Sequence, residues 1–263
     1  INLSVTSSSV ARLGGDEFTI LLENVSGQKS VTIVAKRLIE LSAQPIIIDN
    51  HEIFTSISIG IALFPNDGDE ADILLKNADT AMYHAKKEGR NNYQFFDVSM
   101  NQASVEQLAI ETSLRIAIDN NELMLYYQPQ FSISNSQIVG MEALLRWKHP
   151  QKGFISPASF IPVAEETGLI ISIGEWVIRE ACKQGIEWEL QGYKLVPISV
   201  NLSAKQLREE QLNEIIARIL FETGMNPKYL GLELTESAII IEPERALERL
   251  QNIKSLGIKM SMD

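Results

Sequence analysis

The chain has 263 residues, 45% of them hydrophobic and 22% charged, which is typical of a folded protein of two domains and not of a disordered one. Its net charge of −11 argues against a protein that binds nucleic-acid polymers or membrane surfaces by general electrostatic attraction. A single cysteine, Cys182, excludes an intramolecular disulfide and a cysteine-based metal cluster. No apolar run reaches the roughly 18–20 residues that span a bilayer, so we expect a cytoplasmic location, with any membrane anchor of the parent protein lying upstream.

The first part of the chain alternates strand and helix patterns. The predicted elements, in chain order, are strands at 10–13 and 17–23, a helix at 27–42, a strand at 53–64, a helix at 70–89 and a short strand at 93–97. The first two strands flank a Gly-Gly pair and predict a β-hairpin. Residues 53–64 alternate polar and apolar side chains with period two, which predicts one strand with one covered face. Gly89 is placed to end the second helix.

A polar segment after Asp97 separates this part from the next. It precedes a helix that we expect from about Ser104 to Asp119, because Ser104 and Gln107 have the spacing of a capping box. We therefore predict a first domain over residues 1–98, a linker helix over 99–119 and a second domain over 120–263.

The second part begins with two strands, at 123–127 and 138–147. Their connection is too short for a crossover helix, so we expect them to be antiparallel. Three further strands, at 196–201, 230–235 and 258–263, alternate with helices and imply a parallel sheet with helices outside it. The expected fold is α/β, with the second domain a TIM-like (β/α)8 barrel cut off after about five strands. The opening without Met also suggests a fragment of a longer protein.

Four of these strands have one wholly apolar face and one face that carries polar groups, because side chains alternate along a strand. The polar faces carry Glu142, Asn201, Glu233 and Asp263. Burying three carboxylates together costs several kcal/mol each unless they are neutralised. Hard oxygen ligands of this kind favour Mg²⁺, Mn²⁺ or Ca²⁺ over Zn²⁺. The alternative is a set of structural salt bridges, but Glu142 and Arg146 stand four residues apart on a strand, about 13 Å, and cannot pair with each other.

At these residues the sequence becomes similar to known families. Residues 104–263 resemble the EAL family of cyclic di-GMP phosphodiesterases, through YYQPQ (126–130), EALLRW (142–147), FISPASFIPVAEETGLI (154–170), VNLS (200–203), ELTES (233–237) and the terminal SMD. Residues 10–97 resemble the GGDEF family of diguanylate cyclases, through RLGGDEF, SIGIALFP, DTAMYHAKKEGRN and FF. The order GGDEF before EAL is typical of bacterial second-messenger proteins.

The EAL resemblance implies hydrolysis of cyclic di-GMP to linear pGpG, by attack of a water that Mg²⁺ or Mn²⁺ activates, with two ions in a complete site. It implies these roles: metal ligands Glu142, Asn201, Glu233 and Asp263; catalytic residues Glu142 and Glu236, the latter steadying a loop; and substrate-binding residues Gln128, Leu144 and Arg146. The family's second-metal Asp and its later Lys and Glu have no counterpart in this sequence, so we expect this chain alone to be inactive.

The GGDEF resemblance implies a palm-like α/β domain, here its C-terminal portion. It assigns the nucleotide and metal site to Gly14, Gly15, Asp16, Glu17, Lys86 and Arg90. The family's inhibitory Arg-x-x-Asp falls on residues 5–8 (VTSS) and is absent.

Three functions are compatible with these motifs. The first is a hydrolase whose GGDEF domain is regulatory and a candidate for GTP binding. The second is a non-catalytic receptor for cyclic di-GMP, and the third is a bifunctional protein that also makes cyclic di-GMP. The intact ligand set Glu142, Asn201, Glu233 and Asp263 favours the hydrolase. An upstream sensory domain and a homodimer formed through the EAL domain are further expectations.

Overall fold

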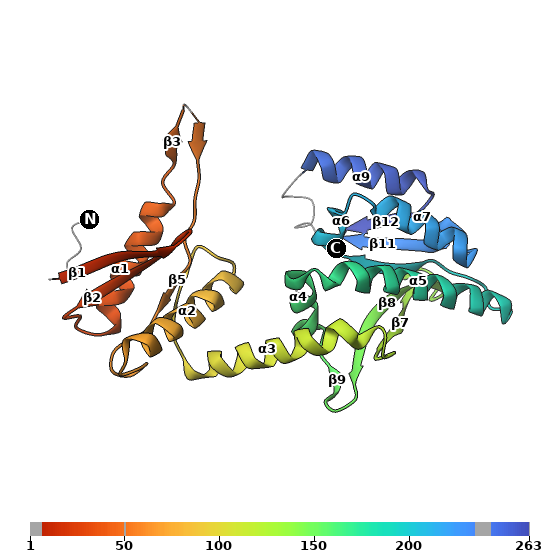
Figure 1. Cartoon of the computed structure of the whole chain (residues 1–263). Coiled ribbons are helices and arrows are strands. Elements are labelled where there is room, and N and C mark those ends of the chain that lie inside the picture. The colour runs from red at the N-terminus through yellow and green to blue at the C-terminus, as the bar shows by residue number, and fades with distance from the viewer. Residues whose placement is uncertain (1–6, 50, 235–242, 263) are drawn as a thin grey trace. The chain divides into compact units, whose positions relative to one another are not determined.

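The computed structural model of the chain describes residues 7–49, 51–234 and 243–262. The chain divides into two compact units, Ile1–Glu106 and Gln107–Asp263, and each is described by itself (Figure 1). No helix in the described part of the chain is long and apolar enough to cross a membrane.

The described residues of the first unit form paired strands and helices, up to the start of the helix that leads into the second unit. In chain order these are β1 (Ser7–Gly14), β2 (Glu17–Glu23), α1 (Gln28–Ser42), β3 (Ile46–Ile48), β4 (His51–Ile53), β5 (Ile59–Ile61), α2 (Ala71–Lys87) and β6 (Tyr93–Phe95). β1 and β2 form the predicted antiparallel hairpin, and β3 pairs with β4 in the same sense. β5 and β6 are parallel. Gly89 has a φ of +100° just after α2, which confirms its predicted place at the helix end.

The prediction of a single strand over residues 53–64 is wrong. The structure has two strands there, because β4 pairs with β3 whereas β5 pairs with β6, and residues 54–58 belong to neither. Alternating polar and apolar side chains report which face each residue occupies, but they carry no information about the hydrogen-bonding partner of the backbone.

The helix α3 (Val98–Ala117) begins six residues earlier than we predicted. The side chain of Asp97 accepts a hydrogen bond from the Ser99 N–H at 2.9 Å, as an N-cap residue does. Hydrogen bonding with the Ser99 side chain, and then with its backbone N–H, holds the pKa of the Asp97 carboxyl below its usual value. Ser104 lies inside the helix, where its hydroxyl donates to the carbonyl of Met100 at 2.9 Å, so it is not the N-cap. α3 runs through the boundary between the two units.

The second unit is a mixed sheet with helices. Its elements are β7 (Leu123–Phe131), β8 (Ile138–His149), β9 (Gly153–Ile155), α4 (Pro157–Thr167), α5 (Leu169–Leu190), β10 (Ile198–Leu202), α6 (Ala204–Leu207), α7 (Leu212–Thr223), the 3₁₀ turn η1 (Pro227–Tyr229), β11 (Leu230–Leu234), α9 (Pro243–Ser255) and β12 (Lys259–Met262). The strand order is β12-β11-β10-β8-β7, and β9, which we did not predict, pairs with β8.

The strand directions agree with the sequence. β7 is antiparallel to β8, whereas β8, β10, β11 and β12 are parallel. The described strands form an open sheet, so completion into a barrel stays a prediction. One face of the sheet packs on helices: α5 contacts β7, β10 and α7, and α7 contacts α9 (Figure 1). Trp147, Ile198, Val200, Leu232 and Ile258 belong to the core on that face.

Candidate functional site

The second face of the sheet carries the polar residues that the sequence singled out. Along β10 the apolar Ile198, Val200 and Leu202 are buried in the core, whereas Asn201 between them is exposed. This alternation confirms that these strands have one core face and one chemically different face. Register then decides which polar residues meet, because it sets which residues of neighbouring strands lie opposite one another or within a short offset.

Adjacent strands place three predicted metal ligands beside one another. Asn201 on β10 pairs directly with Glu233 on β11, and Glu142 on β8 pairs with Ser199, two residues before Asn201. The side-chain amide of Asn201 spans this offset, since its Nδ2 donates a hydrogen bond to Glu142 Oε1 at 2.8 Å. The amide of Asn201 thereby has a fixed orientation, with its oxygen as the remaining acceptor.

Glu233 is the most buried of these groups, with 9% of its surface exposed. Within the described ranges, no hydrogen bond or ion pair is formed by its carboxylate. A nearly buried carboxylate is costly without a partner, and a bound cation supplies one. Glu142, Asn201 and Glu233 offer only oxygen ligands, so the described donors fit a hard divalent ion such as Mg²⁺ or Mn²⁺.

Two predicted site residues, Glu236 and Asp263, lie outside the described residues. In the part that the structure describes, no group of three or more His, Cys, Asp or Glu side chains is placed to hold a metal ion. Among the predicted ligands that the structure describes, only Glu142 and Glu233 are carboxylates, because the third is an asparagine. The complete ligand set therefore stays a prediction.

The predicted substrate-binding residues share the face of Glu142. Gln128 on β7 lies directly opposite Glu142, and Leu144 and Arg146 follow on β8 at intervals of two. The Arg146 guanidinium donates to the Leu145 carbonyl at 2.9 Å. An arginine that stays on this face can bind a phosphate oxygen near the carboxylates without pairing with Glu142.

Arg146 also meets a residue that the sequence reasoning missed. Its Cζ atom lies 5.6 Å from the ring centroid of Tyr126 on β7, within the range of a cation–π contact. The period-two pattern of β7 places Tyr126 on the same face as Gln128, but the motif alone gave it no role.

In the first unit, the predicted nucleotide site is a tight turn between β1 and β2. Gly15 has a φ of +53°, and Arg12 closes the turn by donating from Nε and Nη2 to the Gly15 carbonyl at 3.0 and 2.6 Å. Asp16 and Glu17 are exposed at the turn.

The predicted basic residues of this site, Lys86 and Arg90, lie at the end of α2. Both are exposed, and among the described residues no hydrogen bond or ion pair joins either to the Gly-Gly turn. The glycines and the acidic pair share one turn, and the part of Lys86 and Arg90 in this site stays a prediction.

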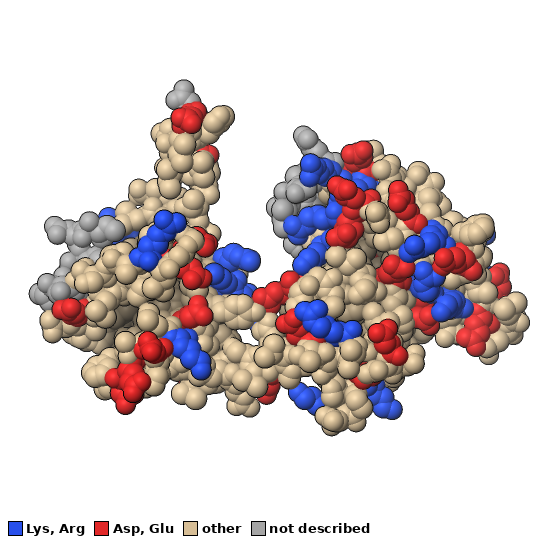
Figure 2. Space-filling model, in the orientation of Figure 1, with Lys and Arg blue, Asp and Glu red and all other residues tan. Residues whose placement is uncertain are grey.

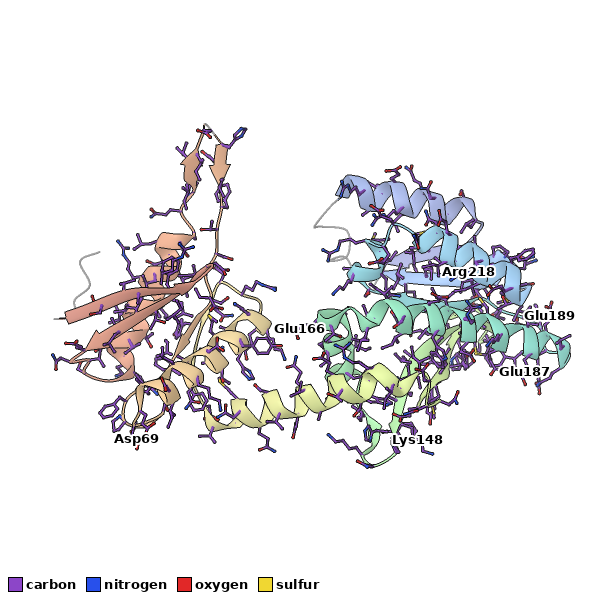
Figure 3. All side chains as sticks on the ribbon, in the orientation of Figure 1. Asp69, Lys148, Glu166, Glu187, Glu189 and Arg218 are labelled. Carbon is purple, nitrogen blue, oxygen red and sulfur yellow. The ribbon has the colours of Figure 1, made fainter. Side chains whose placement is uncertain are left out.

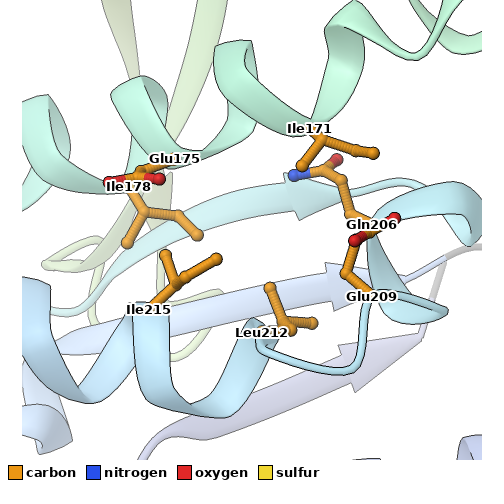
Figure 4. A pocket seen from close by; sticks show the side chains of 7 residues that line it. All are labelled: Ile171, Glu175, Ile178, Gln206, Glu209, Leu212 and Ile215. Atoms are coloured by element: carbon orange, nitrogen blue, oxygen red, sulfur yellow. The ribbon is translucent and has the colours of Figure 1, made fainter.

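Other features of the second unit lie on its helices. A small, mostly apolar pocket between α5 and the segment α6–α7 is lined by Ile171, Glu175, Ile178, Gln206, Glu209, Leu212 and Ile215 (Figure 4). It is on the helix-covered side of the sheet, so it is not the polar site.

Charges of both signs are interspersed on the outer helices (Figure 2). Glu175 on α5 accepts from Arg179 at 3.1 Å and from Arg218 of α7 at 2.9 Å, and Arg179 also pairs with Glu222. The Arg179 guanidinium holds the pKa of the Glu222 carboxyl below its usual value. These pairs tie α5 to α7 and account for charges that do not belong to the polar site.

Comparison with known families assigns both units. The family model of the EAL domain matches residues 111–263 of the sequence. The family model of the diguanylate cyclase, GGDEF domain, matches residues 2–92. The chain therefore belongs to the EAL family, with a GGDEF domain before the EAL domain.

Among curated proteins, the bifunctional diguanylate cyclase/cyclic di-GMP phosphodiesterase MucR of Pseudomonas aeruginosa is 44% identical over 97% of this chain. The cyclic di-GMP phosphodiesterase PdeR of Escherichia coli is 38% identical over 97% of it. The chain spans only 37% and 38% of the lengths of these relatives.

Among solved structures, the PaMucR phosphodiesterase in complex with c-di-GMP is 40% identical, with a TM-score of 0.57 over 59% of this chain and 63% of that one. The S helix-GGDEF-EAL structure of Vibrio cholerae LapD covers 99% of this chain and 60% of its own, with a TM-score of 0.60. At 17% identity, the LapD likeness concerns the fold alone.

Proposed function

We propose that the EAL domain of this protein hydrolyses cyclic di-GMP to linear pGpG. The observation that carries this proposal is the meeting of Glu142, Asn201 and Glu233 on one face of the sheet, with Arg146 on the same face. The names of MucR and PdeR, which share this region of sequence, support the same activity. Because the chain spans little more than a third of those proteins, the activity and partners of the whole protein belong to the proposal.

In this proposal Glu142, Asn201 and Glu233 hold Mg²⁺ or Mn²⁺ together with Asp263. The metal supplies polarisation of the phosphoryl group and a lowered pKa of bound water. The protein's own contribution is orientation: the hydrogen bond from Asn201 fixes the Glu142 carboxylate before substrate arrives.

The substrate contacts follow from the same face of the sheet. Arg146 binds a phosphate oxygen through its guanidinium, and Gln128 binds the substrate through its amide from the neighbouring strand. Leu144 lies between Glu142 and Arg146 and supplies apolar contact. We assign Glu236 the role of steadying the loop after β11.

The test is incubation of the full-length protein with cyclic di-GMP and Mg²⁺ or Mn²⁺, with pGpG as the measured product. Glu233→Gln keeps the side-chain volume and removes the charge, so we expect it to reduce the rate at least 100-fold. Glu189→Gln, at the far end of α5, is the matched control and should retain wild-type activity (Figure 3). Ca²⁺ should inhibit, because its looser coordination positions water poorly. A wild-type protein that binds cyclic di-GMP but makes no pGpG with any metal would favour the receptor instead.

A bifunctional protein is the second candidate, and the intact turn with its exposed Asp16 and Glu17 favours it. We nevertheless assign the GGDEF domain a regulatory role, with GTP as its candidate ligand. For the whole protein, the candidate assembly is a homodimer formed through the EAL domain. Incubation with GTP separates these functions. Formation of cyclic di-GMP that is lost in Asp16→Ala/Glu17→Ala would establish synthesis, whereas GTP that only changes the rate of pGpG formation would establish regulation.

A further inference from the structure

Two aromatic side chains are exposed next to the polar site. Tyr126 on β7 is 50% exposed and Phe154 on β9 is 56% exposed, and their rings are 6.2 Å apart in an edge-to-face arrangement. Single exposed hydrophobic residues are common on protein surfaces and need no explanation. An exposed aromatic pair that contacts an arginine of the polar face does need one, because such groups are typical of binding sites.

Register places both rings on the face of the polar site. Tyr126 lies directly opposite Leu144, and Phe154 lies directly opposite Lys148. Leu144 and Lys148 are separated from Glu142 by even numbers of residues, so all of these side chains belong to one face. The aromatic pair is therefore continuous with the site and does not belong to a separate surface.

Arg146 contacts the aromatic pair and lies on the same face of β8 as Glu142. Its guanidinium contacts the ring of Tyr126 and donates once, to the Leu145 carbonyl. Among the residues that the structure describes, its other N–H groups have no partner. A guanidinium held in this way presents donors to a phosphate while a neighbouring ring presents an apolar surface to the adjoining base.

We propose that Tyr126 and Phe154 form a stacking surface for one guanine base of cyclic di-GMP. This inference rests on the proposed function and adds the part of the site that distinguishes a dinucleotide from any other phosphodiester. Stacking suits this surface because every base has a planar π-face. Phe154 is the platform for the base, and Tyr126 supports both the base and Arg146.

The test compares two substrates in the full-length protein with Mn²⁺: cyclic di-GMP, and its abasic analogue, the same cyclic sugar–phosphate diester without the guanine bases and therefore without an aromatic ring. The measured quantity is the ratio of kcat/KM for the first substrate to kcat/KM for the second. For Phe154→Ala we expect this ratio to fall roughly tenfold, mostly through a higher KM for cyclic di-GMP, as loss of a base-stacking ring implies.

Tyr126→Ala should lower the ratio similarly, and Tyr126→Phe should restore it, because Phe keeps the ring. Phe221→Ala is the matched control, since Phe221 is an exposed aromatic residue on α7. Circular dichroism checks that each variant is folded.

The outcomes separate this inference from the proposed function. If the wild type hydrolyses cyclic di-GMP and Phe154→Ala keeps the wild-type ratio, the stacking surface is wrong and the hydrolase stands. An equal loss on both substrates would likewise refute stacking. If the wild type binds cyclic di-GMP without hydrolysis, the hydrolase is wrong, and a roughly tenfold weaker Kd in Phe154→Ala still supports the surface. A wild type that neither binds nor hydrolyses it would overturn both.

Discussion

Replacing Gly174 by alanine should destabilise the second unit, although alanine is the better helix former. Gly174 lies in the second turn of α5, and a Cβ there would stand 1.7 Å from Nε2 and 2.6 Å from Cδ of Gln206. Gln206 cannot simply turn away. It is 4% exposed, and its Oε1 accepts hydrogen bonds from the backbone N–H and the hydroxyl of Ser203 at 3.1 and 2.8 Å, as part of a capping box.

The size of the stability loss in Gly174→Ala depends on the interactions that the new methyl group disrupts. Moving Gln206 breaks two hydrogen bonds and leaves a buried amide unpaired, which costs about 2–4 kcal/mol. The higher helix propensity of alanine offsets about 1 kcal/mol of this cost. We therefore expect Gly174→Ala to lower the free energy of unfolding by about 1–3 kcal/mol.

A second substitution makes the reasoning testable. In a Gln206→Ala background the obstructing amide is absent, so Gly174→Ala should stabilise by up to about 1 kcal/mol. Urea unfolding followed by tryptophan fluorescence measures both effects, because the three tryptophans of this chain, Trp147, Trp176 and Trp188, all lie in the second unit. An equal loss of stability in the two backgrounds would refute the contact between Gly174 and Gln206 as the cause.

Three further predictions concern other parts of the chain. Gly60→Ala should cost about 1–3 kcal/mol or more, because its Cβ would stand 1.9 Å from the backbone oxygen of Ala78; hydrogen exchange should show lost protection in β5 and α2. Burial raises the pKa of the Cys182 thiol to about 12, so a thiol reagent at pH 8 should label it only after unfolding. Arg179 lowers the pKa of Glu222, so their pairing stabilises the folded protein at pH values above the ordinary carboxyl pKa. The difference in unfolding free energy between wild type and Glu222→Gln should therefore vanish as the pH falls below about 4.

Each of these has a clear contrary result. Unchanged protection in Gly60→Ala would mean that α2 shifts without cost. Labelling of native Cys182 at the rate of a free thiol would contradict its burial. A stability difference for Glu222→Gln that grows in acid would mean that the carboxylate is better solvated than paired.

Much of the second unit could be predicted because its strands alternate strictly. Ile198, Val200 and Leu202 are apolar and buried as the period-two pattern indicates, and Asn201 lies on the other face. Alternation also sufficed to put Glu142 and Glu233 on one face. It could not reveal that Asn201 donates to Glu142, because that hydrogen bond depends on a two-residue offset between strands.

The errors have the same physical origin. Residues 53–64 alternate as one strand would, yet β4 and β5 have different partners, and partner choice depends on distant residues. The start of α3 was misplaced because a serine at capping-box spacing competed with Asp97, and only the backbone shows which residue caps the helix. Phe154 belongs to the motif at 154–170, but sequence reasoning assigned it no role, because β9 is a three-residue strand, too short for a periodic signal that would assign its face.

The alternation along β10 has a consequence for how this segment can change over evolution. Core packing constrains the apolar residues Ile198, Val200 and Leu202, so a mutational scan should tolerate other branched apolar residues at these positions. Contacts with the neighbouring strands and with any ligand on the open face constrain Ser199 and Asn201. Replacements of similar size at Asn201 should therefore lose function even where they keep the fold. The five positions of β10, 198–202, would then be under two different selective constraints in strict alternation, one for folding and one for chemistry.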